Sequence, residues 1–420
     1  MAGDPATNTL PSFPDSGTEI PGPAWSPRFE SLSRSMKTSS GPPNRPSNSE
    51  ANQCARNPTP DAQPLSLDVL LEGIVAPLTS LAWGKEGKPG TFDGGAYHAD
   101  GSVCARSLHR KVNFINQPRP LTSLESFPRV RGVHLYGGIL KNEHFGHFLI
   151  ESLSRLWALN RVEQALESIV FYARYPSQPV PKWAHDLLAI VAPGIAVSIV
   201  SRPTVFETLV VADQAAHSVN CCIYGHPWIR DVFAPLREME GASFEKLYVS
   251  RSKLNNAGGF FCERWLEDVL AADGFVTVHP EEYTVREQIA LYNGAKSLIF
   301  AEGSALHLFA LTCRMDQKAY IIQRRKNASI FEWQLRTFGV TPVVGPEAPS
   351  AYFIPERSGR DTLLARVKID FGKLREQLAA NGFTSGADRL LPDETLIRQE
   401  IECIESHIGQ RLVEHHSDAL

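Results

Sequence analysis

The sequence predicts an α/β fold made of two parallel-sheet units that follow one another along the chain. From residue 131 onward, short apolar runs alternate with helical patterns, which is typical of parallel strands joined by helices. The expected strands of the first series are 133–136, 169–172, 197–200 and 208–211. The expected strands of the second series are 246–250, 275–279, 297–301 and 319–323, with helices at 261–271, 285–293 and 304–311. We therefore expect two Rossmann-like units in tandem.

Composition divides the chain into four segments. Residues 1–63 are rich in proline and serine, so we expect a disordered tail; a docking segment at Gly41-Pro42-Pro43 is the alternative. Residues 64–240 form the first unit, with a helix expected near 69–81, and residues 241–391 form the second. In residues 392–420, helical spacing of apolar side chains predicts an amphipathic helix that packs on the body or pairs with another chain. Those side chains are Ile397, Ile401, Ile404, Ile408 and Leu412.

Charge and cysteine content exclude several classes of protein. The 420 residues carry 42 Lys and Arg against 46 Asp and Glu, a net charge of -4, so no basic field exists to attract nucleic acid. Seven cysteines without a C-x-x-C spacing fit neither a disulfide framework nor a zinc cage. Without a long apolar run or a secretory signal, we expect a soluble cytoplasmic protein, and its oligomeric state stays open.

The segment 136–157, YGGILKNEHFGHFLIESLSRLW, predicts a strand, a Gly-Gly turn, a polar loop and a helix. On a regular helix His147, Glu151 and Arg155 recur every four residues and share one flank. A histidine at the start of such a helix, with a glutamate one turn later, can take a proton from a hydroxyl group. Three alternatives stay open: an ordinary salt-bridged face, a metal site of His144, His147 and Glu151, and a core role for His144.

Two further segments predict an anion site in the second unit. The strand at 246–250 delivers Ser250, Arg251, Ser252 and Lys253 to its carboxyl end, and such hydroxyls and cations suit a diphosphate. A solvated turn is the alternative.

The second segment is the junction Glu302-Gly303-Ser304 between a strand and a helix. Gly303 permits close backbone approach, the first N–H groups of the helix attract an anion, and Glu302 can accept hydrogen bonds from ribose hydroxyls. No GxGxxG motif occurs in the chain. A helix capped by Ser304 beside a surface glutamate is the alternative.

In this order the segments resemble glycosyltransferase family 61, which includes bacterial capsular polysaccharide transferases and eukaryotic N-acetylglucosamine and xylose transferases. The resemblance covers about residues 130–325. The family motif N-x-x-H-F-x-x-E-x-x-x-R-L fits His147, Phe148, Glu151, Arg155 and Leu156, with Asn142 in the loop ahead. Further matches are Ser250-Arg251, Glu263, residues 286–289 and residues 303–306. Two positions depart from the pattern, because Glu302 stands where many relatives have His and Leu308 where they have Asn.

The resemblance implies a GT-B fold, with an acceptor domain followed by a nucleotide-sugar domain. It also implies inverting, metal-independent transfer from a nucleoside-diphosphate sugar, expected to be UDP-linked, to a glycan or glycolipid in polysaccharide biosynthesis, without a cofactor. His147 or Glu151 would be the base, and Asn142, His144 and Arg155 would bind or orient the acceptor. Ser250, Arg251, Lys253, Glu302, Gly303 and Ser304 would bind the donor. If the acceptor is lipid-linked, the protein could associate peripherally with the membrane surface. The alternative to a transferase is a non-catalytic relative that acts as a binding or scaffold protein.

Overall fold

A computed structural model describes most of the chain beyond residue 63. The described ranges are 64–84, 88–111, 113–216, 222–254, 258–326, 329–347, 349, 351–358, 365–386 and 391–416. The tail expected at residues 1–63 and its Gly41-Pro42-Pro43 segment lie outside them. No helix in the described part is long and apolar enough to span a membrane.

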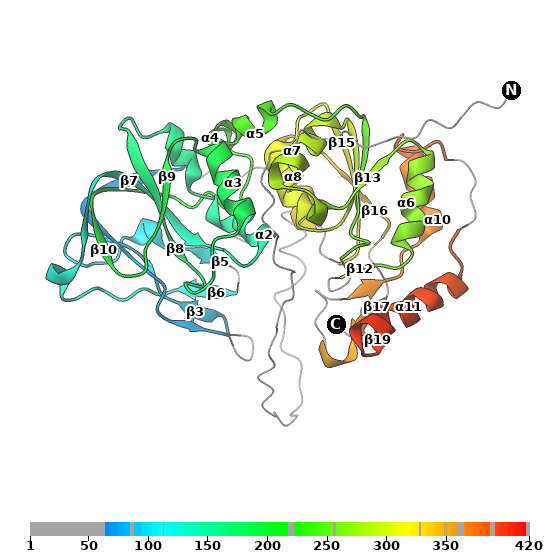
Figure 1. The fold of residues 1–420 in the computed structure, drawn as a ribbon, viewed down its shortest axis with the longest axis horizontal. Helices are drawn as coiled ribbons and strands as arrows, with labels where there is room; N and C mark the ends of the chain where they lie inside the picture. The colour runs from blue at the N-terminus through cyan, green and yellow to red at the C-terminus, as the bar shows by residue number, and fades with distance from the viewer. Residues whose placement is uncertain are drawn as a thin grey trace, which may run out of the picture.

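The first half of the chain forms a six-stranded mixed sheet of order β4-β1-β10-β7-β8-β9 (Figure 1). Its strands are β1 (Leu67–Ala76), β4 (Gly95–Tyr97), β7 (Arg129–Leu140), β8 (Leu166–Ala173), β9 (Ala196–Ile199) and β10 (Thr204–Ala212). The four strands β10, β7, β8 and β9 are parallel, so the predicted parallel series is confirmed. β1 pairs antiparallel with both β10 and β4.

The helix expected near 69–81 is wrong, because β1 occupies this segment. Its backbone pairs with β10 from Leu67 to Val75, and Leu70 is buried between the exposed Val69 and Leu71. That alternation is the strand period, but it covers only a few residues. Pairing with a strand more than a hundred residues away decided the local conformation.

A second, smaller sheet of order β2-β3-β6-β5 lies beside the first. Its strands are β2 (Leu81–Ala82), β3 (Gly90–Phe92), β5 (Arg110–Lys111) and β6 (Phe114–Asn116), and short 3-10 turns η1 (Ala105–Ser107) and η2 (Leu124–Ser126) flank it. Asn116 holds this sheet and its loops together, because it accepts a hydrogen bond from the His109 N–H and donates to the carbonyls of Phe92 and Gly94. This sheet fixes the segment that carries His109 and Lys111.

The second half forms a five-stranded parallel sheet of order β13-β11-β14-β15-β16. Its strands are β11 (Lys246–Val249), β13 (Val276–Val278), β14 (Ser297–Ala301), β15 (Lys318–Ile322) and β16 (Val343–Gly345). The predicted second series is therefore confirmed. The strand order reverses between β11 and β14, and ligands of open parallel sheets bind outside the carboxyl ends at such a point.

Helices from both halves share one hydrophobic core. The helices outside the C-terminal layer are α3 (Lys182–Val191), α4 (Pro227–Val232), α5 (Ala234–Glu238), α6 (Glu263–Ala272), α7 (Val285–Gly294), α8 (Ala305–Thr312) and α9 (Ser329–Phe338), with the 3-10 turn η5 (Pro280–Glu282). In Figure 1, α2 (Phe145–His147) and α3 face α7 and α8, and side chains such as Leu149 and Phe309 belong to the same buried cluster. This contact brings the two sheets' helical faces together.

The C-terminal segment adds a layer to the second half. It contains β12 (Gly259–Phe260), β17 (Ala351–Pro355), β18 (Arg366–Val367), β19 (Leu412–His416), η6 (Glu356–Ser358), α10 (Phe371–Ala380) and α11 (Glu394–Ile408). α11 confirms the predicted amphipathic helix, and Ile397, Ile401 and Ile404 pack on a hydrophobic cluster of the second half. Leu412 is not on this helix: Gly409, at φ 65°, ends it, and Leu412 begins β19.

Candidate functional site

The segment after β7 is not the regular helix that the sequence predicts. It begins as the α-turn α2, widens into a π-helical turn η3 (Phe148–Ser152) and ends as a 3-10 turn η4 (Leu156–Asn160). His144 caps its start, because its Nδ1 accepts the His147 N–H at 3.2 Å. The hydrogen bonds of Arg155 go to backbone carbonyls, and none goes to His147 or Glu151. Turns of the π type are frequent at functional sites.

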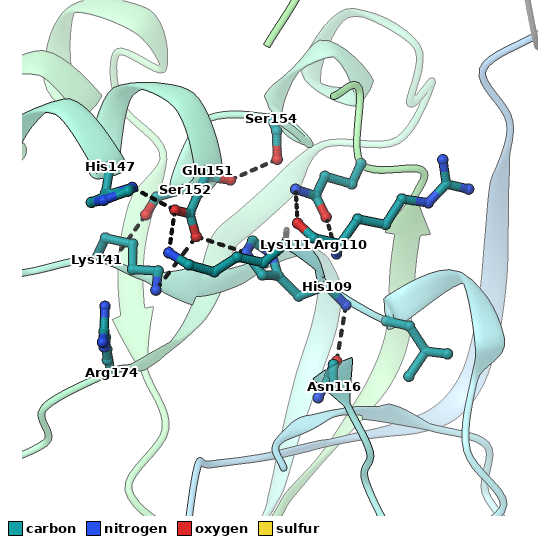
Figure 2. A network of polar contacts seen from close by, with 12 residues as sticks. His109, Arg110, Lys111, Asn116, Lys141, His147, Glu151, Ser152, Ser154 and Arg174 are labelled. Carbon is teal, nitrogen blue, oxygen red and sulfur yellow. Dashed lines mark hydrogen bonds and ion pairs between the residues drawn. The ribbon is translucent and has the colours of Figure 1, made fainter. Parts of the chain in front are cut away.

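Glu151 is buried at the centre of a polar cluster (Figure 2). Its Oε1 lies 2.7 Å from His147 Nδ1 and 2.8 Å from Lys111 Nζ. Its Oε2 lies 2.9 Å from His109 Nε2 and 3.4 Å from Lys141 Nζ. The sequence predicted only the contact with His147, since the other three nitrogens come from β5, from the residue before it and from the end of β7.

Opposing effects set the protonation of this cluster. Burial raises the pKa of Glu151, but hydrogen bonds from His109 and His147 and the charge of Lys141 hold the pKa well below its usual value. Burial lowers the pKa of His109 to about 4 and that of Lys141 to about 8. Glu151 is therefore an ion at neutral pH, and both of its oxygens have nitrogen partners.

Arg155 holds the segment that carries His109. It is buried, and its guanidinium donates to the carbonyls of Arg106, Ser107 and Leu108 and to the carbonyl of Ala212. The same group lies 5.3 Å from the centre of the Tyr136 ring. Four carbonyl oxygens therefore stabilise the buried charge of Arg155, and among the described residues no carboxylate pairs with it. Arg155 thus acts on the site through the backbone of 106–108.

Asn142 and His144 lie in the loop between β7 and α2. The Asn142 amide donates to the carbonyls of Tyr175 and Gln178, at 3.1 and 3.0 Å, and joins this loop to the one after β8. The His144 ring lies 4.7 Å from the ring of His147. Burial, followed by the charge of His147, lowers the pKa of His144 to about 4. His144 is therefore next to His147, whereas the amide of Asn142 connects two loops.

The second wall of the site lies at the carboxyl end of β11. Ser250 donates to Glu267 at 2.6 Å and to Glu263 at 3.1 Å, and Glu263 also accepts the Arg251 N–H at 2.7 Å. The Arg251 side chain donates to the carbonyl of Gly258 and packs against Gly303, where a Cβ would lie 2.5 Å from its Nη1. Gly303 is required for this close approach.

Two arginines that the sequence analysis missed complete this wall. Glu302 is fully buried and accepts hydrogen bonds from the N–H groups of Arg324 and Arg325 and from Nε of Arg325 at 2.6 Å. Arg324 Nε donates to the carbonyl of Glu302. Burial and the charges of Arg251 and Arg325 lower the pKa of Arg324 to about 9. The signal was available, because both arginines directly follow an expected strand, as Ser250 and Arg251 do.

Lys253 is separate from these arginines. Its ammonium pairs with Glu282 at 2.8 Å, and both side chains are about half exposed. Of the predicted donor residues, Arg251, Glu302 and Gly303 are therefore packed together.

The two walls meet at Gly146 and Ser304. A Cβ on Gly146 would lie 2.7 Å from the Ser304 hydroxyl oxygen, so α2 touches the start of α8. The buried His307 of α8 is also close, since burial and then the charges of His147 and His144 lower its pKa to about 4. Ser304, a predicted donor residue, thus lies against the turn that carries His147.

The metal alternative finds no support in the geometry. Within the described ranges, no group of three or more His, Cys, Asp and Glu side chains could hold a metal ion. Both oxygens of Glu151 contact nitrogens, and the two lysine ammonium groups there would repel a cation.

Part of the chain matches a known protein family. The model of the family Glycosyltransferase 61 matches residues 145–322, which run from α2 to β15. The matched part contains the π-helical turn, the Ser-Arg turn and the Glu302 junction, whereas His109, Lys111 and Lys141 lie before it. No curated protein matches the chain.

Replacing Arg155 by lysine should reduce stability, because an ammonium cannot bond four separate carbonyls. We expect the free energy of unfolding to fall by about 3 kcal/mol, the cost of leaving buried polar groups without partners. Chemical denaturation measures it. The control is Arg161→Lys, since Arg161 is partly exposed over the Trp228 ring. Equal losses in the two variants would contradict the role given to Arg155.

His109 should make the protein sensitive to acid. Its pKa is about 4 in the folded chain against about 6.5 in an unfolded one, so the unfolded state binds more protons between these values. Stability therefore falls as the pH drops from 7 to 5. In His109→Gln, we expect this fall to be smaller by about 1 to 2 kcal/mol. Chemical denaturation at pH 7 and pH 5 measures this loss of stability, and the exposed His185→Gln is the control. If His109→Gln loses as much stability between the two pH values as the unaltered protein, His109 is not the cause.

Proposed function

We propose, from the premise that residues 145–322 of this chain belong to glycosyltransferase family 61, that the protein moves a sugar from a nucleoside diphosphate to a hydroxyl of a glycan or glycolipid. The family implies glycosyl transfer in general, with a sugar donor and a glycan acceptor. One observation carries the finer proposal. Arg251, Arg324 and Arg325 gather at the carboxyl edge of the second sheet, and the His147–Glu151 pair lies on the opposite wall.

The three arginines support a diphosphate site. Burial and then the charges of Arg251 and Arg325 lower the pKa of Arg324. Burial and the charge of Arg325 lower the pKa of Arg251. Cations packed together in a poorly solvated place repel one another, and a diphosphate relieves this repulsion while accepting their hydrogen bonds. Their position beside β11 and β14 is where open parallel sheets bind ligands. We take UDP as the leaving group.

Glu302 has a different role here from the one that the sequence suggested. Both of its oxygens accept hydrogen bonds from the Arg324-Arg325 segment, so we assign it to holding these arginines rather than to the ribose. The arrangement that follows is of the GT-B type, with the acceptor on the first unit and the nucleotide sugar on the second.

We assign the proton transfer to His147. Glu151 is a stabilised carboxylate with four nitrogen contacts and is a weak base, but its contact with Nδ1 leaves Nε2 of a neutral His147 ring as the acceptor. The acceptor oxygen forms a bond to the anomeric carbon as its proton passes to Nε2. The bond from that carbon to the phosphate oxygen breaks on the opposite face, which inverts the configuration. The arginines stabilise the charge left on the diphosphate, and no metal is needed.

A non-catalytic relative is the second candidate. Two residues favour it: Glu302 and Leu308 stand where many relatives have His and Asn. The buried carboxylate of Glu302 also offsets part of the charge of the arginines. The two candidates differ in one measurement. A catalytic site should slowly hydrolyse its nucleotide sugar without acceptor, and a scaffold should not.

UDP should raise the melting temperature of the protein, and Arg251→Ala should remove this rise. The lost contact with a phosphate corresponds to about 2 to 3 kcal/mol, or roughly a 30-fold to 150-fold weaker Kd. Thermal shift with UDP and with a panel of UDP sugars measures it. The exposed Arg398→Ala, on α11, is the control. No rise with any nucleoside diphosphate in the unaltered protein would refute the donor site.

His147→Ala should lower the kcat of donor hydrolysis by a factor of about 10² to 10⁴, which is the usual contribution of a general base. The thermal shift with UDP should stay unchanged, because His147 is not part of the donor wall. The exposed His185→Ala should keep the full rate. If His147→Ala also keeps its rate, the proton acceptor lies elsewhere.

A further inference from the structure

Lys141 is a buried cation that the proposed reaction does not use. It directly follows β7, and its side chain is 3% exposed. Among the described residues its ammonium has one ion-pair contact, 3.4 Å from Glu151 Oε2, and no hydrogen bond. The closer positions around Glu151 belong to His109, Lys111 and His147. An ammonium removed from water normally keeps hydrogen-bond acceptors, so a partner for Lys141 is missing.

The charges around Lys141 do not balance. Arg174 pairs with Glu143 at 2.7 Å, and Lys111 pairs with Glu151 at 2.8 Å. Lys141 is the remaining cation of this group. Figure 2 places Arg174 beside it, and both Arg174 and Lys111 act on it as like charges. After burial, these neighbours lower the pKa of Lys141 to about 8, so a bound anion would stabilise its charged form.

Neighbouring groups fit a sugar. Glu143 Oε2 and Asn142 Oδ1 are buried acceptors without a donor among the described residues, and sugar hydroxyls are donors. The Arg174 guanidinium lies 5.5 Å from the centre of the Trp83 ring and 5.2 Å from that of Tyr175. Trp83 is 64% exposed, so it offers an aromatic face on which a pyranose ring can pack.

We propose that the acceptor is an acidic saccharide whose carboxylate or phosphate binds Lys141 and Arg174, with its sugar ring beside Trp83 and its reactive hydroxyl at His147. This inference rests on the proposed function and names its acceptor class. A neutral sugar offers hydroxyls but no charge to balance the third cation. A sugar acid and a phosphorylated or phosphate-linked sugar share the required chemistry.

The test is binding of D-glucuronate, glucose 6-phosphate and glucose to the full chain with saturating UDP, at matched sodium chloride. Calorimetry should give at least tenfold tighter binding for one of the acids than for glucose, and the better acid identifies carboxylate or phosphate. In Lys141→Met this preference should fall at least tenfold. Lys182→Met, on the exposed face of α3, should keep it.

Two results would overturn the inference. One is equal binding of all three sugars, and the other is an undiminished acid preference in Lys141→Met. The thermal shift with UDP alone separates the two proposals, since it tests the donor wall and does not involve Lys141. If UDP raises the melting temperature but no acid is preferred, the acidic acceptor is wrong and the transferase proposal stands.

Discussion

The ionised state of Glu151 is the constraint on which the first wall depends. A carboxylate in this buried position is stable only because nitrogens from three separate parts of the chain reach it. The same contacts fix the ring of His147 and the ends of Lys111 and Lys141. Removing the charge would leave two ammonium groups without compensation, so the cluster must form as a unit. The fold supplies the parts: the small sheet brings His109 and Lys111, and Arg155 holds the backbone just before them.

The second wall follows the same principle. Glu302 and Glu263 are buried carboxylates that hold arginines and a Ser-Arg turn rather than contacting solvent. Three arginines gather beside these carboxylates, and they are the basis of the donor site proposed above. The shared core between α2, α3, α7 and α8 brings the two walls together, with Gly146 against Ser304. A side chain at Gly146 would push Ser304 away, and a side chain at Gly303 would displace Arg251.

The carboxyl ends of the strands connect the chemistry of both halves. Lys141 follows β7, Arg174 follows β8, Arg251 follows shortly after β11, and Glu302 follows β14. A parallel sheet gathers the residues after its strands at one edge, where helix starts also lie. The carboxyl edges of the two sheets therefore supply the two polar walls, although the sequence contains no long motif for either. For this reason the donor site that we propose does not require a GxGxxG motif.

The sequence alone predicted four parallel strands in each half and the helices α6, α7 and α8, because apolar periodicity is a local property that each segment carries by itself. It also offered His147, Glu151, Arg251 and Gly303 as candidates, since residues near strand ends and helix starts can be recognised from their neighbours. Only the tertiary structure decided that Leu67–Ala76 is a strand, that Arg155 turns inward to four carbonyls, and that His109 contacts Glu151 across 42 positions. Likewise, Glu302 was visible in the sequence, but its bond to Arg325 was not. Such pairings depend on which distant segments the fold brings together, and no local pattern records that choice.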